Sequence, residues 1–188
     1  MKIAILFLIV SFTSLQVFAQ GNSNKTKVKV PEIAIMDIES GQPSPDIILQ
    51  VLSPNEAGLA PSTSFEGMNS IWLNYTTITK GRSNGTKKDI LVKISNGQLP
   101  EGVQLQLKAY EATNNGKGKK GSPKSETLVI TSTDQGFIGE IESSYTGNGA
   151  GKGHLVEYSL IIDEENIEGL DASLNETEIS ITYTLSDA

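Results

Sequence analysis

The amino-acid sequence predicts an all-β protein, a single antiparallel β-sandwich of about eight or nine strands. Three observations predict this fold class. Apolar and polar residues alternate with a period of two in many short segments, which is typical of strands with one buried face. Segments rich in Gly, Pro, Asn and Ser separate these alternations at intervals of about 8 to 15 residues. No convincing amphipathic helix is found between them.

Each expected strand rests on its own alternation, and the clearest lies near the C-terminus, where Tyr183 stands between Thr182 and Thr184. In order along the chain, the expected strands contain residues 33–35, 47–51, 71–75, 90–94, 103–109, 128–130, 137–141, 156–162 and 179–185. Residues 52–68 are expected to form a long connection. Residues 114–125 are rich in Gly and Lys and are expected to form the tip of a loop.

Residues 1–19 have the features of a cleavable signal peptide. Lys2 gives a positively charged start, residues 3–10 are an unbroken apolar run, and Val17 and Ala19 occupy the −3 and −1 positions of a cleavage site. The apolar run is too short to span a bilayer, which takes about 20 residues, and no longer apolar stretch follows. We therefore expect an exported protein without a membrane span, located in the periplasm, at the cell surface or outside the cell.

The rest of the chain is expected to form one domain. Residues 20–30 consist mostly of Asn, Ser, Lys and Gly and predict a flexible N-terminal segment. Residues 31–188 then form the β-sandwich domain, whose length is ordinary for a single hydrophobic core. The sequence contains no cysteine, so neither a disulfide framework nor a lipid-attachment cysteine is available.

The charge of the chain argues against nucleic-acid binding. The sequence has 15 Lys and Arg against 22 Asp and Glu, a net charge of −7 at pH 7, and the charges are spread along the chain. Proteins that bind a phosphate backbone depend on clustered cations. We therefore expect a protein or glycan partner rather than a nucleic acid.

The sequence offers little for catalysis, and we expect no enzyme, no cofactor and no metal site. Residues 116–121 match the letters G-x-G-x-x-G, but Ser122 and Pro123 lead into another expected strand instead of a helix, so no phosphate would meet a helix N-terminus. His154 is the only histidine, and without cysteine it forms neither a Cys-His pair nor a histidine-rich metal site. A single histidine at the start of a strand is more often structural or exposed than catalytic.

One acidic segment, residues 163–171, carries oxygen ligands of the kind that calcium prefers. The spacing of an EF-hand loop is missing from it. Calcium binding and a merely solvated acidic loop both remain open for this segment.

Three aromatic residues are the candidates for ligand binding: Trp72, Tyr110 and Tyr145. Carbohydrate-binding modules present aromatic rings on a flat face or loop, where the apolar side of a sugar stacks on them. The alternative for Trp72 is packing in the core or between sheets, which is the commoner position of a tryptophan.

Several short segments resemble small exported proteins of a kind common in Bacteroidetes, which are uncharacterised secreted β-sandwiches. The matching segments are residues 71–75 (IWLNY), 99–103 (LPEGV), 145–149 (YTGNG), 153–155 (GHL), 158–160 (YSL) and 181–186 (ITYTLS). The resemblance implies an Ig-like or fimbrial-like sandwich and assigns no activity. In that group a cysteine tends to precede the Tyr-Thr-Gly turn, and here Ser144 stands in its place. More loosely, the C-terminal strand is similar to those of spore-coat-U-like and fimbrial adhesin domains, which assemble by donating a strand to a neighbour.

These observations predict an exported, non-enzymatic structural or interaction domain, with a cell-surface or fimbrial-like role. The alternative is a secreted carbohydrate-binding module. Residues 20–35 leave two possibilities open: they donate a strand to a neighbour and so support self-assembly, or they form the first strand of their own domain. Pro31 interrupts the apolar alternation of this segment.

Overall fold

The computed structural model describes residues 25–81, 85–113, 115–173 and 177–188. The expected signal peptide at residues 1–19 lies outside the described residues. The chain divides into two units, Met1–Val30 and Pro31–Ala188. In the first unit the described residues 25–30 are exposed and have no regular secondary structure.

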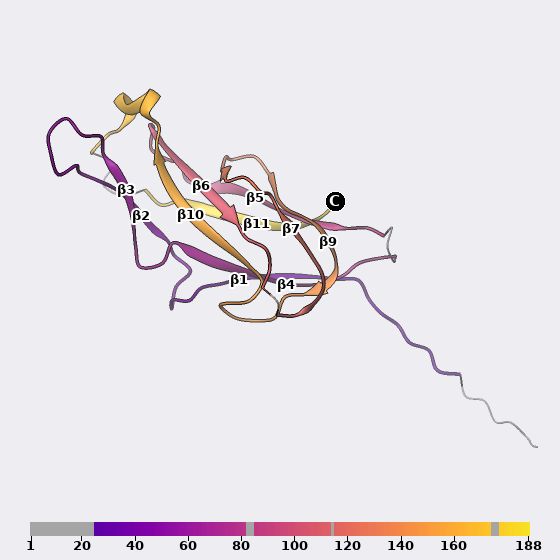
Figure 1. Cartoon of the computed structure of the whole chain (residues 1–188). Helices are drawn as coiled ribbons and strands as arrows, with labels where there is room; N and C mark the ends of the chain where they lie inside the picture. Colours follow the sequence, from indigo (N-terminus) through magenta and orange to yellow (C-terminus); the bar gives the residue numbers. More distant parts are fainter. Residues whose placement is uncertain (1–24, 82–84, 114, 174–176) are drawn as a thin grey trace, which may run out of the picture. The chain divides into compact units, whose positions relative to one another are not determined.

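The second unit is almost entirely β, which confirms the predicted fold class (Figure 1). Its strands are β1 (Ile33–Glu39), β2 (Ile48–Leu52), β3 (Ser62–Glu66), β4 (Ser70–Ile78), β5 (Lys88–Asn96), β6 (Val103–Ala109), β7 (Lys117–Pro123), β8 (Leu128–Val129), β9 (Gln135–Tyr145), β10 (His154–Ile162) and β11 (Ser180–Asp187). The one short 3₁₀ helix among the described residues, η1 (Glu164–Gly169), follows β10.

Nine of these strands form one antiparallel sheet, and β2 and β3 form a separate two-stranded sheet. Along the large sheet the order is β11-β5-β9-β4-β10-β6-β8, with β1 added to β4 and β7 added to β9. Strand β4 connects the two halves of this sheet. It pairs with β10 through residues 70–73 and with β9 only through Thr76 and Thr77.

The large sheet folds back on itself, which gives a sandwich-like arrangement. Strands β10 and β11 are far apart in the sheet order, yet the Tyr158 hydroxyl of β10 lies 2.6 Å from the Tyr183 hydroxyl of β11. Likewise, the Tyr75 hydroxyl of β4 donates a hydrogen bond to the Lys120 carbonyl of β7. The two halves of the sheet therefore face each other, and their apolar sides meet in one core.

The core contains the inward-facing residues that the period-two alternation predicts. On β4, Ile71, Leu73 and Tyr75 are almost completely buried. The buried apolar residues are Ile71, Leu73, Tyr75, Ile90, Val92, Leu105, Leu107, Ala109, Ile130, Phe137, Ile138, Ile141, Val156, Tyr158 and Tyr183. Ile47, directly before β2, and Leu49 of β2 pack against this core, so the small sheet contacts it.

The prediction that residues 114–125 form a loop tip is wrong, because Lys117–Pro123 form strand β7, which pairs with β9. The segment has almost no apolar side chains, so its alternation could not be seen in the sequence. It pairs through its backbone, and glycine permits the close approach. At Gly121, which has a φ of +74°, a Cβ atom would lie only 2.5 Å from the Gly139 carbonyl oxygen.

The expected long connection at residues 52–68 also contains a strand, β3, which pairs with β2. Its sequence, STSFE, is polar apart from Phe65. A single apolar residue shows no period, and the strand forms because β2 offers it a backbone partner.

Candidate functional site

Two of the three predicted binding residues lie in one row across the outer face of four neighbouring strands. The β1–β4 register places Glu39 opposite Trp72, and the β10–β4 register places Leu155 on the other side of Trp72. The Tyr110 amide donates to the Leu155 carbonyl over 2.9 Å, which continues the β10–β6 pairing. Directly opposite residues in antiparallel strands share a face, so the order along the row is Glu39, Trp72, Leu155, Tyr110.

The neighbouring row on the same face is polar. Glu157 lies between Ser70 of β4 and Lys108 of β6. We call the residues of both rows together the Trp72 face: Glu39, Ser70, Trp72, Lys108, Tyr110, Leu155 and Glu157.

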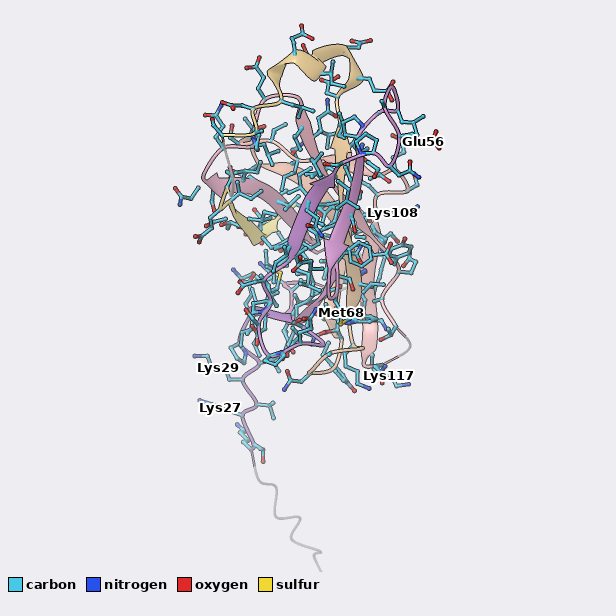
Figure 2. The ribbon with its side chains drawn as sticks, turned by 90° about the vertical axis from the view of Figure 1, so that its left-hand side faces the viewer. Lys27, Lys29, Glu56, Met68, Lys108 and Lys117 are labelled. Atoms are coloured by element: carbon cyan, nitrogen blue, oxygen red, sulfur yellow. The ribbon has the colours of Figure 1, made fainter. Side chains whose placement is uncertain are left out.

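Two contacts hold the Tyr110 side chain in place. The Tyr110 hydroxyl donates a 2.6 Å hydrogen bond to Glu157 Oε2, and the Lys108 ammonium lies 5.6 Å from the Tyr110 ring centroid. Figure 2 shows Lys108, which is labelled there. The hydrogen bond to Glu157 raises the pKa of the Tyr110 hydroxyl, so the phenol stays neutral and remains a donor.

The Trp72 face combines apolar and polar groups as a binding surface does. Trp72 and Leu155 are half-buried, and Tyr110 is 38 % exposed. The two aromatic side chains sit on strands separated by β10, so they are about 10 Å apart across the sheet. Two carboxylates and one ammonium stand beside them. A ligand can therefore pack on the rings while the charged groups form hydrogen bonds with its polar edge.

Tyr145, the third predicted residue, is not part of this row. It ends β9, is 49 % exposed and pairs with Thr76 and Lys117. Because Thr76 lies four residues after Trp72 on β4, about 13 Å separates the two positions along the strand.

No family model matches this chain, and no curated protein or solved structure matches it either. The resemblance to secreted β-sandwiches and fimbrial domains therefore stays a prediction. No helix among the described residues is long and apolar enough to cross a membrane.

The only histidine lies inside the sandwich. His154 is completely buried, with Nδ1 2.8 Å from the Tyr110 carbonyl oxygen and Nε2 2.9 Å from the Lys120 carbonyl oxygen. Its Nε2 also lies 3.0 Å from the Tyr75 hydroxyl. The imidazole thus bridges β4, β7 and the end of β6, and it is not accessible to a ligand.

The acidic segment 163–171 uses some of its side chains to cap its own backbone. Asp163 caps η1, accepting from the Glu165 amide over 3.2 Å and from the Asn166 side chain over 2.7 Å. The Ser173 amide donates to Asp171, and this hydrogen bond lowers the pKa of the Asp171 carboxyl. Within the described residues, no group of three or more His, Asp or Glu side chains is placed to hold a metal ion.

Sequence reasoning missed the residues that complete the Trp72 face. Alternation on β10 placed Leu155 and Glu157 on the side opposite the core residue Val156, but it did not show which strands lie beside β10. The pairings with β4 and β6 join segments more than 40 residues apart. Only an alignment of covarying residues carries a signal of that kind in a sequence.

Proposed function

We propose that this protein is an exported, non-enzymatic interaction domain that binds its partner on the Trp72 face. The observation that carries the proposal is the row of Trp72, Leu155 and Tyr110 on the outer face of one sheet. Trp and Tyr are the residue types that most often dominate binding energy at interfaces. Export rests on the features of residues 1–19 in the sequence.

The composition of the surrounding surface supports this proposal. The row beyond Glu157 and Lys108 carries Gln106 and Ser159, so the aromatic row is a local feature and not the general character of the sheet. An outer sheet face that only meets water usually carries polar residues. The hydrogen bond between Tyr110 and Glu157 also fixes one ring before any ligand arrives, which lowers the entropy lost on binding.

The test measures binding of the labelled, exported protein to whole producing cells and to their envelope protein and polysaccharide fractions. Trp72→Ala and Tyr110→Ala should each weaken binding about tenfold or more, as expected for residues at the centre of an interface. Tyr145→Ala is the matched control, because it removes an exposed tyrosine outside the row.

The unfolding free energy of each variant is measured in parallel, since Trp72 is half-buried. Folded Trp72 and Tyr110 variants that bind as tightly as the unchanged protein would overturn the proposal. Mass spectrometry of the bound material should find it chemically unchanged, and turnover of that material would overturn the non-enzymatic assignment.

A glycan is the second candidate ligand, favoured by the combination of two aromatic rings with carboxylates on a sheet face. Because the rings lie about 10 Å apart across the strands, a ligand that touches both must be extended. An oligosaccharide meets this requirement, with its apolar faces on the rings and its hydroxyl groups on Glu39 and Glu157.

Fluorescence tests this candidate directly, because Trp72 is the only tryptophan in the chain. A panel of glycans that binds should change the Trp72 emission in a saturable way, and Tyr110→Ala should weaken that titration while Tyr145→Ala leaves it unchanged. Absence of any response across the panel would leave a protein as the partner.

A further inference from the structure

Strand β1 has a free edge that is both apolar and acidic. It pairs with β4 on one side, and no strand among the described residues pairs with its other side. Ile35 is 66 % exposed and Ile38 is 39 % exposed. Asp37 and Glu39 lie on the same strand, and neither forms an ion pair with another described residue.

One hydrogen bond shows which backbone groups point toward this free edge. The Ile38 amide donates to the Asp37 side chain over 2.9 Å and not to β4. Because amide direction alternates along a strand, the amides of the even-numbered residues of β1 face the free edge, and those of the odd-numbered residues face β4.

The segment that precedes β1 is apolar and basic, and so complements the apolar and acidic edge of β1. Residues 25–30 read KTKVKV, so lysines alternate with Thr26, Val28 and Val30. Val28 is 84 % exposed and Val30 is 68 % exposed, and Figure 2 labels Lys27 and Lys29 on this extended segment. Such an alternation is typical of a strand with one apolar and one basic face, and here it lacks a strand partner within the described residues.

We propose that two copies of this chain pair through residues 27–39 as antiparallel strands, related by a two-fold axis at Ile33. In this register Lys29 lies opposite Asp37 of the second copy, and Lys27 lies opposite Glu39 of the second copy. The two-fold axis repeats both ion pairs, because each copy contributes its basic half and its acidic half. This is the self-complementary contact of an isologous dimer.

The apolar residues and the proline fit the same register. Val28 lies opposite Ile38 and Val30 lies opposite Met36, so the exposed valines gain aliphatic partners. Pro31 is odd-numbered, so its missing amide would not have pointed at the second copy and no hydrogen bond between the copies is lost. The oppositely charged residues are also odd-numbered and occupy the non-hydrogen-bonded positions, where side chains approach most closely.

A second copy fits this edge better than an unrelated strand. The chain is acidic overall, with a net charge of −7, yet Lys27 and Lys29 stand as far before Ile33 as Glu39 and Asp37 stand after it. The pairing uses the whole of residues 27–39 in both copies. The β1 edges of both copies are then paired along their whole length, so this contact closes as a dimer and does not continue to a third copy through β1.

Charge reversal tests this proposal by light scattering and sedimentation equilibrium on the exported protein. The unchanged protein should be a dimer at low salt and dissociate as salt rises, because exposed ion pairs are screened. Lys27→Glu with Lys29→Glu, and separately Asp37→Lys with Glu39→Lys, should each give a monomer. Mixing the two double variants should restore a heterodimer, and all four changes in one chain should restore the homodimer.

Two further measurements keep the test decisive. Lys117→Glu with Lys124→Glu reverses the same amount of charge at exposed positions elsewhere and should leave the dimer intact. Near-ultraviolet circular dichroism checks that each variant keeps its folded core. An unchanged protein that is monomeric at low salt, an open polymer instead of a dimer, or double variants that do not associate when mixed would each overturn the proposal.

Discussion

One pair of buried phenols links the two halves of the folded-back sheet, and the energetic role of this pair can be measured. The hydroxyls of Tyr158 and Tyr183 lie 2.6 Å apart, and the two residues are only 6 % and 8 % exposed. Tyr158 belongs to β10 and Tyr183 to β11, which are far apart in the sheet order. Their hydrogen bond therefore exists only because the two halves of the sheet face each other.

Replacing either residue by Phe keeps the ring and removes one hydroxyl. In Tyr183→Phe the ring still packs against Phe137, whose centroid is 6.1 Å away, but the Tyr158 hydroxyl stays buried without its partner. An unsatisfied buried hydroxyl costs about 1–3 kcal/mol, so each single variant should lose about that much unfolding free energy. The double variant has no hydroxyl left to desolvate, and its loss should be smaller than the sum of the single losses by about 2 kcal/mol.

Urea denaturation, monitored by the fluorescence of Trp72, gives these free energies, provided that the slope of the unfolding free energy against urea concentration is the same in all variants. Tyr145→Phe is the control. It removes an exposed hydroxyl and should change stability by less than about 0.5 kcal/mol. Single losses that add up in the double variant would show that the two hydroxyls do not interact, and the proposed facing of β10 and β11 would be refuted.

Three other predictions concern the core and one turn. First, burial raises the pKa of Tyr158 to about 12, whereas the unfolded phenol ionises near pH 10. Stability should therefore fall above about pH 10, and between about pH 10 and 12 Tyr158 should contribute about 1.4 kcal/mol per pH unit to that fall, so the slope should be smaller by this amount in Tyr158→Phe. Second, Leu73→Ala empties a completely buried site on β4 and should cost about 2–5 kcal/mol in urea denaturation. Third, Gly153→Ala places a Cβ atom 2.0 Å from the Leu73 carbonyl oxygen, at a φ of +65°, and should cost at least about 2 kcal/mol of unfolding free energy by the same assay. Gly149→Ala is the control: its added Cβ has nothing within 4 Å, so it should cost only about 1 kcal/mol of backbone strain. Equal losses at the two glycines would contradict the steric argument.

The strands that the sequence predicted well are those that bury one face. On β4, Ile71, Leu73 and Tyr75 alternate with residues of a partly covered second face, and all three lie in the core. Strand β11 follows the same rule, with Tyr183 buried between exposed threonines. Apolar and polar residues alternate along a strand because only one of its faces is buried, so the alternation appears only in strands that pack one face against the core.

The strands that the sequence did not predict have no such face. Strand β7 consists mainly of Lys and Gly, and its Lys119 side chain pairs with Glu140 and Glu142 of β9 at the surface. Its pairing comes from backbone hydrogen bonds and surface charges, which leave no apolar period. A basic, glycine-rich segment therefore has the composition of a loop even where it is the edge strand of a sheet.

The Trp72 face could be predicted only in part, for a related reason. Aromatic character alone selected Trp72 and Tyr110, and it selected Tyr145 equally. What separates Tyr145 from the other two is strand pairing between distant segments, which determines the row that each side chain joins. Local sequence determines the face of a strand on which a residue lies, while the neighbours across the sheet depend on the whole topology.

The proposed binding on the Trp72 face and the proposed dimer together predict which ligands bind most tightly. In the proposed dimer, odd-numbered residues of β1 lie opposite odd-numbered residues of the second copy, so the outer faces of the two sheets point to the same side. Three strand spacings, or about 14 Å, then separate the two β4 strands. Because Trp72 lies opposite Glu39, six residues from the axis at Ile33, the two Trp72 positions are also about 40 Å apart along the strands. A polymeric ligand with repeating units can contact both faces at once and gain avidity, whereas a short ligand can contact only one. The monomeric variant with Lys27→Glu and Lys29→Glu leaves the Trp72 face unchanged, so it should bind a short ligand as the dimer does, and only its binding to a polymer should be weakened.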